Sequence, residues 1–238
     1  MISNQSVWAV IPASGIGQRM HGDRPKQYLP FCGKTIIEHT LDRLLDCPLV
    51  HGAILILREN DPYWPELNYV PSKPLHIAVG GLERQDSVIN GLTMLTDIMD
   101  DVNALVHDAV RPLVSQSDLT SLINAIENNE SGAILASPLA DTLKRQNQGG
   151  YSQETVDREG LWRALTPQLF NAELLLQALQ KARRSNQVMT DDAAAMEALG
   201  YQPLLVEGSS ENIKITRQDD LRLARLIWLN QLDKQDNK

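Results

Sequence analysis

Two cations close behind a pair of glycines are the first residues of this chain that could do chemistry. The stretch VWAVIPASGIGQRM, residues 7–20, contains Arg19, and Lys26 follows soon after it. Gly15 and Gly17 can adopt backbone angles that other residues avoid, which leaves backbone N–H groups able to face an anion. Nucleotidyl transfer depends on cations held in place around phosphorus, so this loop suits the wrapping of a triphosphate.

Other glycine-loop chemistries fit the same stretch less well. A dinucleotide-binding loop requires GxGxxG, and Met20 stands at the third glycine. A P-loop requires GxxxxGK[ST], and Tyr28 stands where its first glycine belongs. The remaining interpretation is a phosphate-binding loop followed by Lys26, where the fixed φ of Pro25 stiffens the backbone.

A carboxylate at the end of a second apolar run could hold a metal. In ALVHDAVRP, residues 104–112, Asp108 follows a predicted buried strand, and Arg111 comes next. Mg²⁺ often takes one carboxylate plus substrate phosphates, although Asp108 could also begin a turn or pair with Arg111. His107 should face away from Asp108, because side chains alternate along a strand, and we expect it to be packed.

Two more loops each follow an apolar run. In GGLERQDS, residues 80–87, the glycines would let the backbone approach a nucleotide, and a helix N-terminus supplies free N–H groups. Asp86 or Ser87 could instead only cap that helix. In EGSSENIKIT, residues 207–216, Lys214 alternates with isoleucines and points either into a cleft or into water.

The elements that must position these loops alternate between strands and helices. Apolar runs predict strands over residues 7–11, 53–57, 75–79, 104–106, 133–136 and 204–206. Helical periodicity predicts helices over residues 36–45, 86–95, 118–126, 172–183, 192–199 and 219–232. This order indicates an α/β fold of three layers, with a mostly parallel twisted sheet between helices, and ligands bind such sheets at the carboxyl ends of strands.

Two further segments, one near residue 190 and one near residue 150, carry sequence patterns typical of a helix start and of a hairpin. TDDAAAMEALG predicts a helix with Thr190 as N-cap and Gly200 after its last turn. Residues 141–158 are polar, and Gly149–Gly150 separates two strand-like runs, which predicts a hairpin. An isolated hairpin is marginal in water, so we expect residues 138–160 to be an arm that packs on a second copy; an unstructured surface loop is the alternative.

Composition restricts the partners and the location. Asp and Glu total 30 against 22 Lys and Arg, a net charge of −8, which argues against nucleic acid. No run reaches the roughly 20 apolar residues of a membrane span, so we predict a cytoplasmic protein without membrane contact. Cys32 and Cys47 lack metal-binding spacing and are predicted to be reduced, buried thiols. The whole chain, 1–238, is predicted to be one domain.

Taken in order, the stretches PASGIGQRM, RPKQYL, GGLERQDSV, VHDAVRP, DTLKR, TVDREGLWRALTPQ, TDDAAAMEALG and EGSSENIKIT resemble the 2-C-methyl-D-erythritol 4-phosphate cytidylyltransferases, over about residues 7–227. The resemblance implies a Rossmann-like fold and a homodimer joined by its hairpin arms. It implies the reaction of CTP with the methylerythritol phosphate to give the CDP-alcohol and pyrophosphate in non-mevalonate isoprenoid biosynthesis. Ribitol-5-phosphate cytidylyltransferases resemble the same loops, so another polyol phosphate is the alternative acceptor.

The resemblance also implies a role for each candidate. Arg19 and Lys26 would stabilise the pentacoordinate phosphorus, and Asp108 would hold Mg²⁺. The residues implied to surround the nucleotide are Ala13, Ser14, Gly15, Gly17, Gly81, Arg84, Ser87 and Asp108. Those implied to position the sugar phosphate or lie near it are Arg111, Thr142, Arg158, Thr166 and Lys214. A non-catalytic nucleotide-binding dimer, a rival function, would not need Arg19, Lys26 and Asp108 together.

Overall fold

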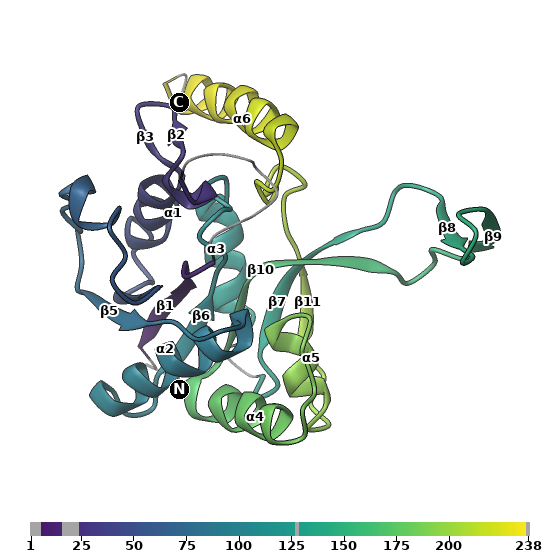
Figure 1. The fold of residues 1–238 in the computed structure, drawn as a ribbon, viewed down its shortest axis with the longest axis horizontal. Coiled ribbons are helices and arrows are strands. Elements are labelled where there is room, and N and C mark those ends of the chain that lie inside the picture. Colours follow the sequence, from purple (N-terminus) through teal and green to yellow (C-terminus); the bar gives the residue numbers. More distant parts are fainter. Residues whose placement is uncertain (1–5, 16–23, 127–128, 237–238) are drawn as a thin grey trace.

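A seven-stranded sheet forms the centre of the protein and determines where the loops meet (Figure 1). The computed structural model describes residues 6–15, 24–126 and 129–236. The strand order is β11-β7-β10-β6-β1-β4-β5. The bounds are β1 Val7–Pro12, β4 Gly52–Leu57, β5 Leu75–Val79, β6 Asn103–Val106, β7 Ala133–Pro138, β10 Trp162–Asn171 and β11 Leu204–Glu207. Every strand predicted from an apolar run is present, which confirms the mostly parallel sheet.

Strand β10 was not predicted, and it runs antiparallel between β6 and β7. Its alternation is broken by a register shift between Ala164 and Gln168, where the Thr166–Pro167 peptide bond is cis. A proline inside a run normally argues against a central strand. The sequence therefore gives no periodic signal for the strand that lies next to the Asp108 loop.

Helices cover both faces of the sheet. The longer ones are α1 Ile36–Leu45, α2 Arg84–Ile98, α3 Gln116–Asn124, α4 Ala172–Arg184, α5 Asp192–Glu197 and α6 Gln218–Asp236. Alternation along β1 divides the core: Ala9 and Ile11 pack with α1 and α3, whereas Trp8 and Val10 pack with α2 and α4. A third apolar cluster lies under α6. These layers confirm the predicted three-layer α/β/α fold.

Helix α5 begins at Asp192 as predicted, but its N-cap lies one residue later than predicted. Asp191, not Thr190, is its N-cap, because the Asp191 carboxylate accepts a hydrogen bond from the Ala194 N–H at 3.0 Å. The prediction of Thr190 as N-cap is therefore wrong. Gly200 follows this helix with a φ of +92°, as expected for a residue that ends a helix. Asp192 is the first residue of the helix and is fully buried.

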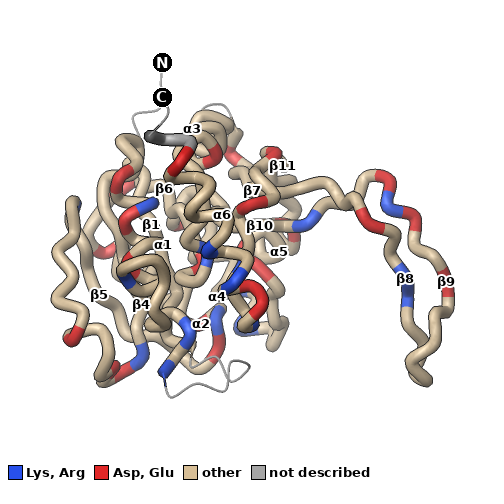
Figure 2. The backbone as a smooth tube through the Cα atoms, turned by 90° about the horizontal axis from the view of Figure 1, so that it is seen from above, with Lys and Arg blue, Asp and Glu red and all other residues tan. Residues whose placement is uncertain are grey.

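The predicted hairpin is present. β8 Leu143–Gln146 pairs antiparallel with β9 Ser152–Val156, and Gly150 in the turn has a φ of +84°. Figures 1 and 2 show this hairpin extending away from the body, beyond β7 and β10. Hence the alternative of an unstructured loop is wrong, whereas packing on a second copy stays a prediction.

A small hairpin next to the sheet corrects the prediction for the thiols. β2 Pro30–Phe31 and β3 Lys34–Thr35 form it, and Cys32 lies exposed in its turn with a φ of +44°. Cys47 is buried and also free. The prediction of two buried thiols is therefore wrong for Cys32, because the turn carries its side chain outward. Two short 3-10 helices, η2 Lys26–Tyr28 and η3 Pro65–Leu67, complete the elements.

Among the described residues, no helix is both long and apolar enough to cross a membrane. The cytoplasmic location and the absence of a nucleic-acid partner stay predictions.

Candidate active site

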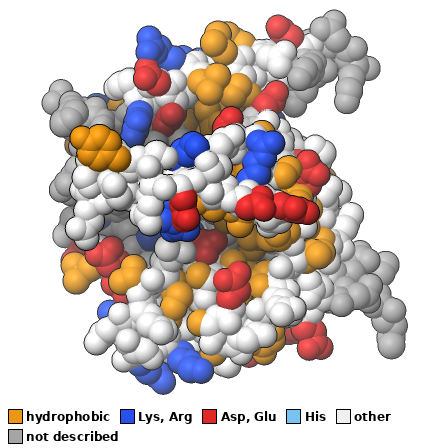
Figure 3. All heavy atoms as spheres, turned by 90° about the vertical axis from the view of Figure 1, so that its right-hand side faces the viewer, with side chains coloured by type: hydrophobic (Ala, Val, Ile, Leu, Met, Phe, Trp, Pro, Cys, Tyr) orange, Lys and Arg blue, Asp and Glu red, His pale blue; other side chains and the backbone are white. Residues whose placement is uncertain are grey.

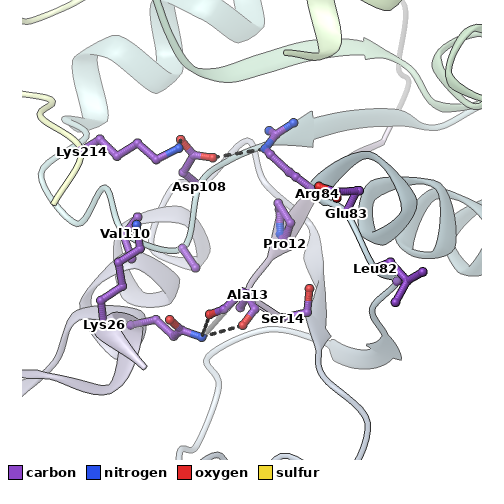
Figure 4. A pocket seen from close by; sticks show the side chains of 14 residues that line it. Pro12, Ala13, Ser14, Lys26, Leu82, Glu83, Arg84, Asp108, Val110 and Lys214 are labelled. Carbon is purple, nitrogen blue, oxygen red and sulfur yellow. Dashed lines mark hydrogen bonds and ion pairs between the residues drawn. The ribbon is translucent and has the colours of Figure 1, made fainter. Parts of the chain in front are cut away.

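The loops that follow three parallel strands of the sheet, β1, β5 and β6, meet the segment after β11 at one pocket (Figure 4). Its volume is about 420 Å³. It is lined by Pro12, Ala13, Ser14, Gly15, Lys26, Gln27, Gly81, Leu82, Glu83, Arg84, Asp108, Ala109, Val110 and Lys214. The pocket lies at the carboxyl ends of the strands, where open α/β sheets bind ligands.

Most of the predicted site residues either line this pocket or are buried directly behind its lining. Those in the wall are Ala13, Ser14, Gly15, Lys26, Gly81, Arg84, Asp108 and Lys214. Those buried behind it are Ser87, Arg111 and Thr166. Thr142 and Arg158 lie on the arm and are exposed, away from the described lining of this pocket. Gly17 and Arg19 fall outside the described residues.

Asp108 is an ionised carboxylate surrounded by cations. Its Oδ1 lies 3.4 Å from Arg84 Nε, and its Oδ2 lies 3.2 Å from Arg111 Nε and 2.9 Å from Lys214 Nζ. Burial alone would raise the pKa of Asp108, but Arg84, Lys214 and Arg111 hold that pKa below its ordinary value. The group therefore keeps its negative charge at neutral pH.

The residues around Asp108 fix its backbone. The Asp108 N–H donates to Thr166 Oγ1 at 3.2 Å, and that hydroxyl also bonds His107 Nδ1 at 3.0 Å. His107 Nε2 lies 3.0 Å from the Arg111 carbonyl oxygen, and its burial lowers the pKa of His107 to about 4. His107 is thus a neutral, packed residue, as predicted, and not a base that faces the pocket.

Arg84 joins the pocket to helix α5. Its Nη1 and Nη2 lie 3.2 and 2.9 Å from the two carboxylate oxygens of Asp192, whose side chain is 1% exposed. Burial lowers the pKa of Arg84, but Asp192 and Asp108 outweigh burial and raise that pKa overall. The start of α5 is held by Gln168, whose Oε1 accepts from the Asp192 N–H at 3.1 Å. The Arg84–Asp192 ion pair is bidentate, so Asp192 fixes the orientation of the guanidinium as well as pairing with its charge.

Lys214 points into the pocket and not into water. The Ile215 N–H donates to the Val110 carbonyl at 2.9 Å, which fixes this segment beside the loop after β6. Asn212 Nδ2 donates to the Thr166 carbonyl at 2.8 Å, and Arg111 Nη1 donates to the Asn212 carbonyl at 2.8 Å. These hydrogen bonds explain why Lys214 points into the pocket, which strand alternation alone could not decide.

The two glycine-containing loops are tied together by serines. Ser14 Oγ lies 2.8 Å from Ser87 Oγ, which also accepts from the Gly81 N–H at 3.1 Å. A Cβ on Gly80 would lie 2.5 Å from Ser14 Cβ, so the loops could not approach this closely with a larger residue there. Glu83 is the N-cap of α2, so neither Asp86 nor Ser87 caps the helix; Asp86, in the first turn, accepts from the Glu83 N–H at 3.3 Å.

Asp108 is the pocket's candidate metal ligand. Among the described residues no group of three or more His, Cys, Asp or Glu side chains could hold a metal ion. Mg²⁺ bound with a nucleotide needs only one or two carboxylates, since phosphate oxygens and waters complete its shell. An ionised carboxylate in the pocket wall therefore fits magnesium of that kind.

The structure adds two residues that the sequence patterns did not single out. Asp192 belongs to TDDA, a stretch that helix capping already explains, and its partner Arg84 lies far away in the sequence. Gln27 lines the pocket next to Lys26 and is 3% exposed. A buried polar residue beside a predicted cation is the one signal that could have indicated Gln27.

The chain is similar in sequence to proteins of one known family. The sequence profile of the family "IspD: 2-C-methyl-D-erythritol 4-phosphate cytidylyltransferase" matches residues 7–230. Proteins of that name from Aliivibrio fischeri and Pseudomonas aeruginosa are 44% and 47% identical, over 97% and 92% of this chain and 96% and 94% of theirs.

Solved structures agree as well. A crystal structure of the Francisella tularensis enzyme of the same name superposes with a TM-score of 0.82 at 33% identity, covering 94% of this chain and 100% of that one. A crystal structure of a 4-diphosphocytidyl-2C-methyl-D-erythritol synthase superposes with a TM-score of 0.83 at 35% identity, covering 94% of this chain and 99% of that one.

Proposed function

Because the chain belongs to the 2-C-methyl-D-erythritol 4-phosphate cytidylyltransferase family and is a nucleotidyltransferase of isoprenoid biosynthesis, we propose that the pocket at the ends of β1, β5 and β6 performs the transfer. One observation carries this proposal: side chains of Arg84, Arg111 and Lys214 converge on the single carboxylate of Asp108 in the wall of that pocket. The comparisons favour the methylerythritol phosphate over ribitol 5-phosphate as acceptor.

The reaction requires positioning and charge, and no general base. A phosphate monoester has a second pKa near 6, so the acceptor is already an anion at neutral pH. One of its oxygens attacks the α-phosphorus of CTP, the bond to the β-phosphate breaks, and pyrophosphate leaves with that electron pair. A neutral, buried His107 is consistent with a site that uses no histidine base.

Fixed cations would offset the repulsion between the two phosphorylated reactants. We assign Lys26, together with Arg19, to the negative charge that grows at the α-phosphorus in the transition state. Lys26 follows Pro25, whose φ is −58°, and precedes the buried Tyr28, so its backbone is held on both sides. A cation held in this way loses little conformational entropy when the substrate arrives.

Asp108 would hold magnesium through one carboxylate oxygen, and the ion would supply positive charge to the phosphates of CTP. Arg84 and Arg111 keep that carboxylate ionised and in place, whereas Lys214, whose side chain is 39% exposed, can also reach an incoming phosphate. We therefore assign Lys214 to the acceptor phosphate. The loops that Ser14 and Ser87 tie together would frame the cytidine with backbone groups of Gly15 and Gly81.

The arm would complete the site of a second copy. In the described part of the chain, β8 and β9 pair only with each other, and an isolated hairpin of this kind is marginal in water. Figure 2 shows charges of both signs along the arm, and Figure 3, viewed along it, shows apolar side chains among charged ones. We propose that the chain is one domain, with residues 138–160 as the arm of a homodimer, and that Thr142 and Arg158 position the sugar phosphate in the partner's pocket.

Pyrophosphate release tests the function. With CTP and Mg²⁺, we expect fast release with 2-C-methyl-D-erythritol 4-phosphate and much slower release with ribitol 5-phosphate. Replacing CTP by ATP or UTP is the matched control for the nucleotide. Equal rates with the two acceptors, or no release with the methylerythritol phosphate, would contradict the proposal.

A further inference from the structure

The side chain of Gln27 connects the turn that carries Lys26 to the loop that follows β1. Its Nε2 donates to the Ala13 carbonyl at 2.7 Å and to the Gly15 carbonyl at 3.1 Å, and Figure 4 draws both bonds as dashed lines. Both partners are carbonyl oxygens, which only accept, so the amide nitrogen must face them. One buried amide thus uses both of its N–H groups on one loop.

The Gln27 amide supplies hydrogen bonds to the loop after β1, at the point where the backbone hydrogen bonds of the sheet end. β1 ends at Pro12, and the Ala13 N–H still donates to the Ile56 carbonyl of β4 at 2.8 Å. Beyond that bond, Gln27 is the partner that the structure gives to the carbonyls of Ala13 and Gly15. Ala13 is buried, and a buried backbone carbonyl without a partner is costly, so the loop conformation at Ala13 depends on this side chain. Gly15 is exposed, and its bond to Gln27 is a second attachment of the same loop.

The two hydrogen bonds also set the direction of a peptide group. In a trans peptide the carbonyl of one residue and the N–H of the next point in opposite directions. Because the Ala13 carbonyl faces Gln27, the Ser14 N–H is turned to the opposite side. Ser14 Oγ meanwhile bonds Ser87 Oγ on the second loop, so the pocket wall is fixed from both ends.

Gln27 lies next to Lys26 in η2, and its neighbour Tyr28 is anchored in the core at 1% exposure. The Tyr28 N–H donates to the Pro25 carbonyl at 2.9 Å, which closes the turn around Lys26. A shift of the loop would therefore pull on the turn through Gln27, and a shift of the turn would pull on the loop. Lys26 and the loop are held as one unit.

We propose that Gln27 is a positioning residue for the nucleotide: it holds the Ala13–Gly15 loop in the conformation that receives CTP and keeps that loop in register with Lys26. This inference rests on the proposed function. It assigns to Gln27 no contact with the reacting atoms. If Gln27 has this role, the affinity for CTP, and not only the stability of the fold, depends on the Gln27 side-chain nitrogen.

Gln27→Met tests the proposal, because methionine has a similar length and shape but no N–H donor. We expect the Kd for CTP, measured by calorimetry with Mg²⁺, to rise about tenfold or more. We expect the KM for the sugar phosphate to change less than about twofold, since the proposed function assigns that substrate to Lys214 and the arm and not to this loop. A purely structural role would lower the Tm and the active fraction but leave the Kd for CTP unchanged.

Gln27→Glu is the second variant and keeps the test usable if the methionine variant does not fold. Its carboxylate would face two carbonyl oxygens, so the Kd for CTP should rise at least as much. The matched control is Gln116→Met, which removes a bond of the same kind, from Gln116 Nε2 to the Arg43 carbonyl at 2.7 Å, outside the pocket. This control should bind CTP as the wild type does.

A folded Gln27 variant whose Kd for CTP stays within about twofold of the wild type overturns the proposal. Wild-type CTP binding and pyrophosphate release are measured in parallel. A wild type that binds no CTP overturns the proposed function and this inference together. A working wild type with unaffected variants overturns the role of Gln27 alone.

Discussion

Asp192 fixes the orientation of Arg84 from outside the pocket. Each carboxylate oxygen pairs with one terminal nitrogen, so only Nε of the guanidinium is directed at Asp108. Removing the Asp192 charge is costly because Arg84, whose side chain is 32% exposed, would keep only Asp108 as a partner while remaining partly desolvated. The charge of Asp192 should therefore matter for both stability and turnover, although Asp192 itself lies behind the pocket.

We expect Asp192→Asn to lower the free energy of unfolding by about 3 kcal/mol and to reduce kcat/KM for CTP by roughly tenfold. Urea unfolding and pyrophosphate release measure the two effects. The control is Asp219→Asn on α6, where Asp219 pairs with Arg222 at 80% and 78% side-chain exposure. This exposed pair should contribute little, and an equal loss in both variants would contradict the role of burial.

His39 gives the protein a dependence of stability on pH. It is 5% exposed, its Nε2 lies 2.7 Å from the Phe31 carbonyl, and burial lowers the pKa of His39. Asp42 favours the charged ring and Lys34 opposes it, but burial is the largest effect. Because the folded pKa is below the unfolded value of about 6.5, the unfolded state binds more protons as the pH falls, and stability decreases.

We therefore expect the wild type to lose stability between pH 7.5 and pH 5.5, a window around the unfolded pKa of about 6.5. His39→Gln keeps a donor for the Phe31 carbonyl but does not titrate, so its stability should change less over that window. Urea unfolding at the two pH values is the measurement. Equal slopes for the two proteins would show that His39 is not the group responsible.

At the scale of elements, the strands and helices with an uninterrupted period were predictable. The apolar runs that form β1, β4 and β6 are fully or nearly fully buried, so nothing polar interrupts them. Strand β10 lies in the same sheet but was missed, because Thr166, Pro167 and Gln168 interrupt its apolar run in the sequence. A sequence pattern records local period, whereas the place of β10 depends on pairing with β6 and β7.

The difference between local sequence patterns and contacts made in the folded chain also explains which site residues were predictable. Asp108, Gly81 and Ala13 were predictable, since each follows an apolar strand and strand ends meet at one edge. Asp192 and Gln27 were not, because their function depends on partners that only the folded chain brings together. Lys214 was ambiguous for the same reason, as strand alternation gives a side but does not say what lies there.

The arm is expected to affect the sugar phosphate without affecting CTP binding. Arg158 lies on it and donates a hydrogen bond to the Ala140 carbonyl at the arm's base. If Arg158 meets the sugar phosphate, Arg158→Ala should raise the KM for that substrate about tenfold or more and leave CTP binding unchanged. Arg145→Ala, which removes the arm's Arg145–Glu154 pair, is the control. Steady-state kinetics with each substrate varied in turn would check this, and an unchanged KM would remove Arg158 from the site.

For the whole molecule, net charge and local charge have opposite signs. The chain carries −8 overall, yet Lys26, Arg84 and Lys214 line the pocket that should receive two anionic substrates. Charges fixed in a cleft act more strongly on a ligand there than distant surface charges, which salt screens. We therefore expect the acidic composition to repel nonspecific polyanions without preventing nucleotide binding.

A homodimer with crossed arms makes a further prediction. Lys26→Ala impairs the pocket of its own chain, whereas Arg158→Ala impairs the arm that would enter the partner's pocket. A mixed dimer of the two variants would then have one intact site and one doubly impaired site. After dissociation and reassociation of an equal mixture, about a quarter of wild-type activity should return, because about half of the dimers are mixed. No recovery would contradict the crossing of the arms.

In the proposed mechanism, cations fixed around the glycine loop stabilise the charge that forms at the α-phosphorus as the cytidylyl group is transferred. The direct measurement is single-turnover pyrophosphate release by Lys26→Ala at saturating CTP, with the Kd for CTP measured in parallel. Lys34→Ala, an exposed lysine paired with Asp42, is the control. We expect a rate about 100-fold or more below wild type, with CTP binding largely retained. An unchanged rate in Lys26→Ala would contradict the proposed mechanism.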